Sequence, residues 1–410
     1  MKSFDTNDCK TNKNIHKMKA KILLISLLIV LINITACNSG KDENILIPAG
    51  FGDKCGFIDR NGNWVINPQF QVVRYFDEKG LAVAKYEDKC GYIDKLGKWI
   101  INPQFDNASE FSENGLAVIK MDGKFGYINQ TGTLVINPQF DDAYLFSNGL
   151  ATVVIDDKYG FIDETGKIII NLQFESATGF YDNKLSGVKL NDLWGFIDKT
   201  GKMVINPQFE NICGFDKCGL CAVKLNGVWG YIDKTGKMVI NPQFDNTFGF
   251  NEKGIALVKI SDKWGYIDKT GKMVINPQFD DANYFAENGL ASVKVNKKWG
   301  FIDKTGKLIV NPQFDYADSF WTNGYVAVKL NNKWGCIDKT GKIIINPQYD
   351  DVLVHEDIIF VGQKKDGRKY EDPKWGIVDK EGKVVAIPQF DWVTETYCGH
   401  YYLKSTLPYK

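Results

Sequence analysis

The polar residue that recurs most regularly in this chain is an aspartate. Its copies are Asp59, Asp94, Asp163, Asp198, Asp233, Asp268, Asp303, Asp338 and Asp379, with Asn129 at the equivalent point of one repeat. A row of carboxylates could bind calcium or act as acid and base. Each aspartate, however, heads an Asp-x-x-Gly turn, where its side chain caps backbone N–H groups. Because Asn129 can form the same cap, the pattern favours a structural role.

Other groups that could support catalysis or bind a cofactor are scarce. The segment from Gly195 to Lys202 superficially resembles a phosphate-binding loop, but five residues separate its glycines and Met203 follows the lysine. A phosphate loop needs four residues there, and a Ser or Thr after the lysine. Histidine, the commonest general base and zinc ligand, occurs at only three positions, which are His16, His355 and His400. We therefore expect no catalytic residue and no cofactor.

The cysteines give a weak metal signal. Cys213, Cys218 and Cys221 are close in sequence, but no histidine lies near them, and Cys221 aligns with alanines in other repeats. These features predict a packing role and no metal site. Cys55 and Cys90 occupy the same point of adjacent repeats, so a disulfide between them is conceivable. An odd number of cysteines after Cys37 argues against a systematic disulfide framework.

Tryptophan precedes glycine at six positions and suggests two roles. These residues are Trp194, Trp229, Trp264, Trp299, Trp334 and Trp375. An exposed ladder of indole rings could stack on sugar faces, whereas buried rings would form a repeated core wedge. Replacement of this tryptophan by Cys, Phe or Tyr in the first four repeats favours packing. The six tryptophans are therefore candidates for core packing and, as the alternative, for a ligand-facing row of aromatic rings.

The elements that position these residues repeat with a period close to 35 residues. The glycines in register are Gly56, Gly91, Gly126, Gly160, Gly195, Gly230, Gly265, Gly300, Gly335 and Gly376. Ten copies at a near-fixed spacing indicate a repeat architecture. In each copy, two runs rich in β-branched and aromatic residues flank the Asp-x-x-Gly turn and predict a hairpin. A third run, such as Leu290–Lys294, predicts one more strand.

The unit Trp264-Gly265-Tyr266-Ile267-Asp268, followed by Asn276-Pro277-Gln278-Phe279, resembles the WG (or KWG) repeat family. The resemblance covers roughly residues 45–404. The fourth copy departs from the pattern, with Leu172 in place of proline and Lys184 in place of a glycine. These repeats are not tied to one activity, so the resemblance implies a fold and no reaction.

The fold class expected from these patterns is all-β, with about ten three-stranded repeats of 35 residues in tandem. One such repeat cannot bury its apolar face alone, so neighbours must stack. Residues 46–50 and 401–404 both align with the third strand, so the array is expected to begin and end on that strand. We favour an open, solenoid-like array over a closed propeller, because familiar propellers have four strands per blade and up to about eight blades.

The N-terminal segment predicts export as a bacterial lipoprotein. Residues 18–21 form a short basic segment, and residues 22–32 form an apolar one. Ile34-Thr35-Ala36-Cys37 then resembles a lipobox. That resemblance implies lipidation of Cys37. The predicted organisation is an extended or non-native N-terminus (1–17), a signal peptide (18–36), an anchored linker (37–44), the repeat array (45–404) and a C-terminal tail (405–410).

Charge and composition narrow the function further. Fifty basic and fifty acidic residues give a net charge of zero, which removes any global attraction to nucleic acid. We expect a non-catalytic scaffold that is anchored to a membrane through lipid only, lies in the extracytoplasmic cell envelope and binds an envelope or surface protein. The alternatives are a glycan- or peptidoglycan-binding module and, third, a carboxylate-based hydrolase.

Overall fold

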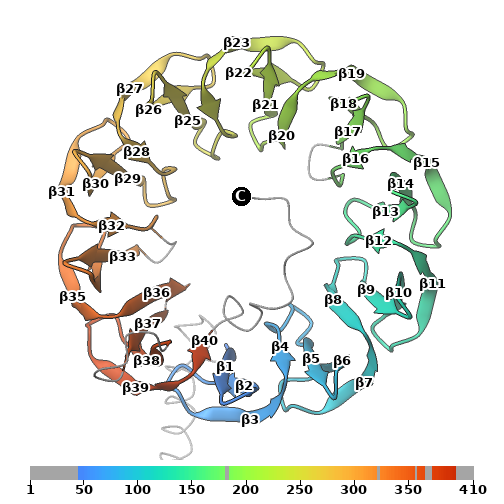
Figure 1. Ribbon diagram of the computed structural model, residues 1–410, viewed down its shortest axis with the longest axis horizontal. Helices are drawn as coiled ribbons and strands as arrows, with labels where there is room; N and C mark the ends of the chain where they lie inside the picture. Colours follow the sequence, from blue (N-terminus) through green and yellow to red (C-terminus); the bar gives the residue numbers. More distant parts are fainter. Residues whose placement is uncertain (1–44, 181–183, 321–323, 356–357, 365–371, 394–410) are drawn as a thin grey trace, which may run out of the picture. The chain divides into compact units, whose positions relative to one another are not determined.

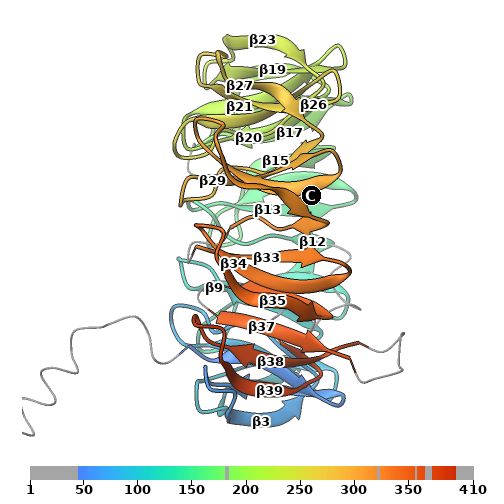
Figure 2. The ribbon, with the colours of Figure 1, turned by 90° about the vertical axis from the view of Figure 1, so that its left-hand side faces the viewer.

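The computed structural model describes residues 45–180, 184–320, 324–355, 358–364 and 372–393, and every regular element in these ranges is a β-strand. Leu46–Lys410 forms one compact unit. Its forty described strands make ten four-stranded antiparallel sheets. Figure 1 shows the sheets arranged as blades in a ring, and Figure 2 shows the same ring from the side. The unit is a ten-bladed β-propeller.

Within those ranges, no helix is both long enough and apolar enough to span a bilayer. The apolar segment 22–32 and the lipobox residue Cys37 lie outside the described residues.

Each blade has its longest strand at the rim and, in seven of the ten blades, a two-residue strand nearest the centre (Figure 1). The blades are numbered here in chain order of their outermost strands. Those strands have seven residues each: β3 (Trp64–Phe70), β7 (Trp99–Phe105), β11 (Leu134–Phe140), β15 (Ile168–Phe174), β19 (Met203–Phe209), β23 (Met238–Phe244), β27 (Met273–Phe279), β31 (Leu308–Phe314), β35 (Ile343–Tyr349) and β39 (Val384–Phe390).

The third strand of each blade, counted from the centre, contains the Trp-Gly motif or its equivalent. These strands are β2 (Lys54–Ile58), β6 (Lys89–Ile93), β10 (Lys124–Asn129), β14 (Lys158–Ile162), β18 (Leu193–Ile197), β22 (Val228–Asp233), β26 (Lys263–Asp268), β30 (Lys298–Asp303), β34 (Lys333–Asp338) and β38 (Lys374–Val378).

The second strands are β1 (Ile47–Phe51), β5 (Ala82–Tyr86), β9 (Leu116–Met121), β13 (Ala151–Ile155), β17 (Ser186–Leu190), β21 (Leu220–Leu225), β25 (Ile255–Ile260), β29 (Leu290–Val295), β33 (Tyr325–Leu330) and β37 (Ile358–Gln363). The innermost strands are β4 (Val72–Val73), β8 (Asn107–Phe111), β12 (Asp142–Ala143), β16 (Ser176–Ala177), β20 (Asn211–Phe215), β24 (Asn246–Thr247), β28 (Asp281–Ala282), β32 (Tyr316–Ala317), β36 (Asp351–His355) and, in blade 1, β40 (Trp392–Val393).

The glycine of the Trp-Gly motif is required by a bulge in the neighbouring outermost strand. In blade 6, Trp229 pairs with Phe244 and Tyr231 pairs with Ile240, so three residues of β23 bulge opposite Gly230. A Cβ at Gly230 would lie 2.5 Å from the Ile240 carbonyl oxygen, so any larger residue would force the backbone of β23 to shift. The motif proline fits in the bulge because that position donates no ladder hydrogen bond.

The prediction of three strands per repeat is wrong, because each blade has four. The outermost strand continues through the Pro-Gln-Phe segment, and one residue later the chain enters the innermost strand of the next blade. In most blades only two residues of that strand pair, as Asn246 and Thr247 do with β25. A pairing this short has no sequence periodicity to detect.

The prediction of an open array is also wrong. The array begins at β1, the second strand of blade 1, and β40 supplies the missing innermost strand. Ala49 pairs with Val393 and Gly50 pairs with Trp392, so the last described strand closes the ring on the first. Residues 401–404, which were expected to form the final strand, lie outside the described residues.

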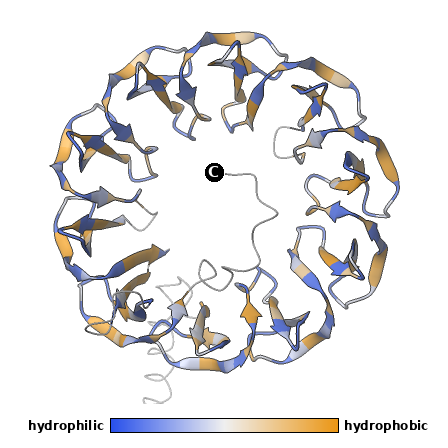
Figure 3. Ribbon diagram, in the orientation of Figure 1, coloured by the Kyte–Doolittle hydropathy of each residue, from blue (hydrophilic) through white to orange (hydrophobic). Residues whose placement is uncertain are grey.

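The core lies between blades. Hydrophobic and hydrophilic residues alternate along the outermost strands (Figure 3), and the inward Ile and Phe side chains are buried. At eight junctions, an aromatic ring of one blade's third strand packs against a phenylalanine of the next blade, with ring centroids 4.6–4.9 Å apart. Such pairs stabilise by about 0.5–1.5 kcal/mol beyond their buried area.

Candidate functional site

Of the loops within a blade, those that join the innermost strand to the second strand vary markedly in sequence from blade to blade. They lie on the same side of the ring as the Asp-x-x-Gly turns, because the first and third connections of an antiparallel sheet share one end. A distance in blade 6 agrees with this placement. A Cβ at Gly219, in such a loop, would lie 3.5 Å from Cε of Lys234, in the Asp-x-x-Gly turn of the same blade. This side is called the loop face.

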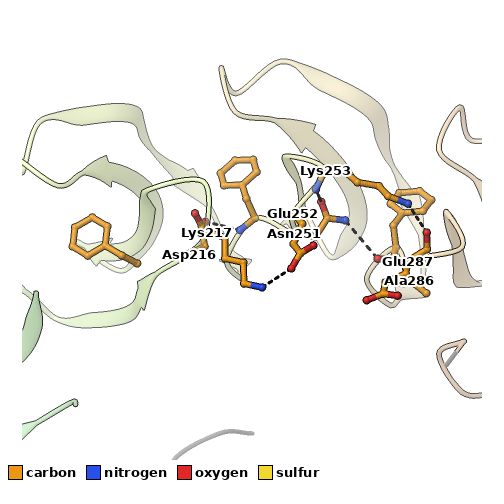
Figure 4. A pocket seen from close by; sticks show the side chains of 10 residues that line it. Asp216, Lys217, Asn251, Glu252, Lys253, Ala286 and Glu287 are labelled. Carbon is orange, nitrogen blue, oxygen red and sulfur yellow. Dashed lines mark hydrogen bonds and ion pairs between the residues drawn. The ribbon is translucent and has the colours of Figure 1, made fainter. Parts of the chain in front are cut away.

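Three neighbouring loops, in blades 6, 7 and 8, enclose a hollow of about 500 Å³ on the loop face (Figure 4). Each loop begins with a phenylalanine that packs on an aromatic ring of the preceding blade. Phe250 lies 4.8 Å from Tyr231, and Phe285 lies 4.6 Å from Tyr266, measured between ring centroids. The phenylalanines therefore fix where each loop starts and line the wall of the hollow.

In blades 6 and 7 the residue after the phenylalanine caps its own loop and contacts the next one. Asp216 accepts hydrogen bonds from the N–H groups of Cys218 (2.8 Å) and Leu220 (3.1 Å), and its other oxygen accepts the N–H of Phe250 (2.8 Å). Asn251 caps Lys253 and donates to the carbonyl oxygen of Phe285 at 3.5 Å.

Ala286 stands at the equivalent point of blade 8 and has no side-chain oxygen or amide with which to cap. In blade 8 the cap comes from Asn288 instead, whose side-chain oxygen accepts the N–H of Leu290 at 3.0 Å.

Charged side chains line the rim of the hollow (Figure 4). Lys217 forms a salt bridge with Glu252 at 2.5 Å, and Lys253 Nζ donates to the carbonyl oxygen of Glu287 at 2.5 Å. Burial raises the pKa of Asp216, although backbone N–H donors oppose that shift. Burial likewise raises the pKa of Cys218, which disfavours a reactive thiolate. The lining thus combines apolar rings with paired charges.

The recurrent aspartates all head turns. Asp268 is typical, because one of its oxygens accepts the N–H of Thr270 (2.9 Å), the hydroxyl of Thr270 (2.6 Å) and the N–H of Lys272 (3.1 Å). Asn129 accepts the equivalent three bonds. The hydroxyl bond lowers the pKa of Asp268 and keeps it ionised. In the described ranges, no three His, Cys, Asp or Glu residues are grouped as metal ligands.

The six tryptophans occupy packing positions. Trp229, Trp299 and Trp375 are buried, with exposed fractions of 8%, 5% and 2%. Trp194, Trp264 and Trp334 are half-buried and pack against clusters between blades. None of the six indole side chains is largely exposed to solvent, so they form no open surface on which a sugar could stack.

The cysteines and histidines do not converge on one site. Cys55, Cys90, Cys213, Cys218, Cys221 and Cys336 are free thiols. Cys213 and Cys218 pack towards blade 7, whereas Cys221 packs towards blade 5. His355 stacks on Tyr75 with ring centroids 5.4 Å apart, away from the hollow. His16, Cys37, Cys398 and His400 lie outside the described residues.

Sequence reasoning missed the hollow because its residues are separated by one repeat each. A signal was present in the segment after each innermost strand, where Phe-Asp-x-x-Gly becomes Phe-Asn-x-x-Gly and then Phe285-Ala286-x-x-Gly289. Only the curvature of the ring shows that these three loops face one space.

The sequence matches one family, described as the WG containing repeat, at residues 56–90, 91–125, 125–159, 159–194, 194–229, 229–264, 264–299, 299–334, 334–365 and 375–403. No curated protein matches the chain at a significant level.

Solved structures match the chain at low sequence identity. A eukaryotic initiation factor is 10% identical, with a TM-score of 0.54, over 86% of this chain and 98% of that chain. Hsv2p of Kluyveromyces lactis is 11% identical, with a TM-score of 0.34, over 70% and 98%. The extracellular domain of BT4673 from B. thetaiotaomicron is 12% identical, with a TM-score of 0.29, over 84% and 64%. At these identities the first match supports the fold alone, and the other two carry no functional argument.

Proposed function

Because the chain belongs to the WG-containing repeat family and closes its repeats into a ring, we propose that it is a non-catalytic binding scaffold of the bacterial cell envelope. The observation that carries this proposal is the hollow between the loops of blades 6 to 8. It combines phenylalanine walls with a rim of paired charges, on loops held by interblade hydrogen bonds. Binding sites are commonly built from such variable loops on a rigid framework.

The proposed ligand is a projecting segment of an envelope protein. The apolar wall can receive an aliphatic or aromatic side chain, while Glu252, Lys253 and Glu287 can pair with charged or polar groups around it. Interfaces of this kind have an apolar centre and a polar rim. The glycan alternative is less well supported, because the six tryptophans are buried or half-buried.

The proposed location rests on the sequence. The segment Ile34–Cys37 resembles a lipobox, and a lipid on Cys37 would tether the ring to a membrane surface without a spanning helix. Anchored in this way, the ring would meet its partner outside the cytoplasm.

The experiment is chemical crosslinking of the full chain in its own cells, followed by purification and mass spectrometry. One abundant envelope protein should be recovered with the natural chain and lost with Cys37→Ala, which removes the anchor. Ala286→Asn places in blade 8 the asparagine that blade 7 has at this position. The longer side chain narrows the hollow, so the recovery of the crosslinked partner should fall several-fold.

The matched control is Asp77→Asn, which places the same residue at the same loop position in blade 2. Asp77 caps the N–H groups of Lys79 and Leu81, and asparagine can do the same. Equal recovery with Ala286→Asn and Asp77→Asn would reject the hollow as the site, and no protein above the Cys37→Ala background would reject the scaffold function.

A further inference from the structure

The ring has an asymmetric charge on its loop face. In blades 5 to 9 the turn between the third and outermost strands has the same sequence, Asp-Lys-Thr-Gly-Lys, at residues 198–202, 233–237, 268–272, 303–307 and 338–342. Ten lysines and five aspartates give these turns a net charge of +5 (10 − 5). The corresponding turns of blades 10, 1, 2, 3 and 4 hold six basic and six acidic residues and sum to zero.

The ten lysines, called here the lysine arc, are presented by rigid turns. In each turn the aspartate is held by its own backbone, as Asp303 is by the N–H groups of Thr305 (2.8 Å) and Lys307 (3.1 Å). Nine of the lysines are exposed, and among the described residues none of these nine forms a salt bridge. Lys199 is half-buried and donates to the carbonyl oxygen of Asn148 at 2.5 Å.

The loops next to the arc do not cancel its charge. The charged residues described in the inner loops of blades 5 to 9 are Lys184, Asp216, Lys217, Glu252, Lys253, Glu287 and Asp318, three basic and four acidic, so they offset only one of the five positive charges. The field of the arc therefore remains positive on that half of the loop face, although the whole chain is neutral.

From this arrangement we propose that the lysine arc binds a flexible, linear polyanion whose phosphate or carboxylate groups pair with successive turns. The tips of these turns are Lys-Thr-Gly and carry no apolar side chain that would insert into a lipid layer. An arc that follows half of a ring suits a polymer able to bend from blade to blade. This binding goes beyond the protein scaffold proposed above and does not depend on the hollow.

The test measures binding of long-chain inorganic polyphosphate to the purified full-length chain in neutral detergent, at several salt concentrations. The arc variant is Lys234→Gln/Lys237→Gln/Lys272→Gln. The control is Lys95→Gln/Lys98→Gln/Lys167→Gln, which removes the same number of charges from equivalent positions of the same face, in blades 2 and 4. Thermal unfolding of both variants verifies that they fold as the natural chain does.

The natural chain should bind polyphosphate with an affinity that falls as salt rises. The arc variant should bind about tenfold more weakly and lose about two units of the salt slope, since each of the three lysine contacts to a single-stranded polyanion contributes about 0.7 unit. The control should stay within about twofold of the natural chain. Equal losses in both variants, binding that ignores salt, or binding to vesicles of anionic lipid without binding to free polyphosphate would each overturn the proposal.

Discussion

The junctions between blades fall into two groups that hold the ring together in different ways. At each of the eight junctions that follow blades 1 to 8, an aromatic residue packs on a phenylalanine of the next blade. Where that aromatic residue is tyrosine, its hydroxyl also donates to a backbone carbonyl of the next blade, as Tyr231 does to Phe248 at 2.7 Å. Each of these junctions repeats the same contact.

The junctions on either side of blade 10 lack this contact. Cys336 and Ile377 stand where the other blades have an aromatic residue. Before blade 10, a lengthened innermost strand, β36, supplies Val352 and Val354 to an aliphatic cluster around Cys336. The junction between blades 9 and 10 is therefore packed mainly with aliphatic side chains in place of the aromatic pair.

The closing junction, between blades 10 and 1, combines polar contacts and two strand pairs with an edge-to-face contact between Trp64 and Phe390, whose ring centroids are 5.5 Å apart. Asp391 binds Lys374 of blade 10 with one oxygen and accepts the N–H of Gly52 of blade 1 with the other, at 2.7 Å. Trp392 lies over Gly50, where a Cβ would be 2.0 Å from Nε1 of the indole. The comparison teaches that the junctions after blades 1 to 8 repeat one aromatic pair, whereas the two junctions beside blade 10 are held by other contacts.

Tyr231→Ala should give the largest effect, because it removes an aromatic pair, a hydrogen bond and a fully buried side chain at an internal junction. We expect the free energy of unfolding to fall by about 3–5 kcal/mol. Denaturant unfolding monitored by circular dichroism measures it. A loss below about 1 kcal/mol would show that the aromatic pairs are not what joins these blades.

Asp391→Ala should destabilise the closing junction by about 2 kcal/mol, since it removes a charged hydrogen bond and a turn cap together. Hydrogen exchange of the β1 amides measures the opening. The matched control is Asp280→Ala, which loses equivalent contacts with Lys263 (2.5 Å) and the N–H of Lys297 (3.4 Å) at an internal junction. Equal protection of β1 in both variants would contradict a special role for Asp391.

Cys336→Ala should have a small effect, of about 1 kcal/mol, because it removes a single buried sulfur atom from the aliphatic cluster. Its comparison with Tyr231→Ala tests the two kinds of junction directly, by the same unfolding measurement. A loss as large as that of Tyr231→Ala would erase the distinction between them.

The smallest effect concerns pH. Hydrogen bonding to Lys263 lowers the pKa of Asp280, so the stability that this aspartate adds is present above its unfolded pKa of about 3.9 and is lost as pH falls further. Burial raises the pKa of Asp216, so its folded form gains stability on protonation and loses it as pH rises through the raised pKa.

Asp216→Asn replaces the oxygen that accepts the N–H of Phe250 by an amide nitrogen that cannot accept, so the variant should be less stable than the natural chain. Because protonation of Asp216 stabilises the natural chain, the difference should widen as pH falls from 7 towards 4. Thermal unfolding across this range measures it, and a difference that shrinks on acidification would show that the sign is wrong.

The sequence predicts the repeat and three of its strands because their residues are close together and alternate regularly. It does not predict β40 or the other two-residue innermost strands, whose pairing leaves no pattern. Closure of the ring depends on the angle between neighbouring blades, and the sequence of one repeat does not reveal that angle. For the same reason, Asp216, Asn251 and Ala286 do not appear as neighbours of one hollow, and lysines 35 residues apart, such as Lys237 and Lys272, do not appear as one charged surface.

The pairing of β1 with β40 also has a consequence for how the chain is made. Ala49 and Val393 are 344 residues apart, so the first strand cannot acquire its partner until nearly the whole chain is available. Until then, one edge of blade 1 stays open to other strands, a recognised route to aggregation. Contacts this distant in sequence also form slowly. During synthesis the growing protein is thus an unclosed arc of blades, and ring closure is its final folding event.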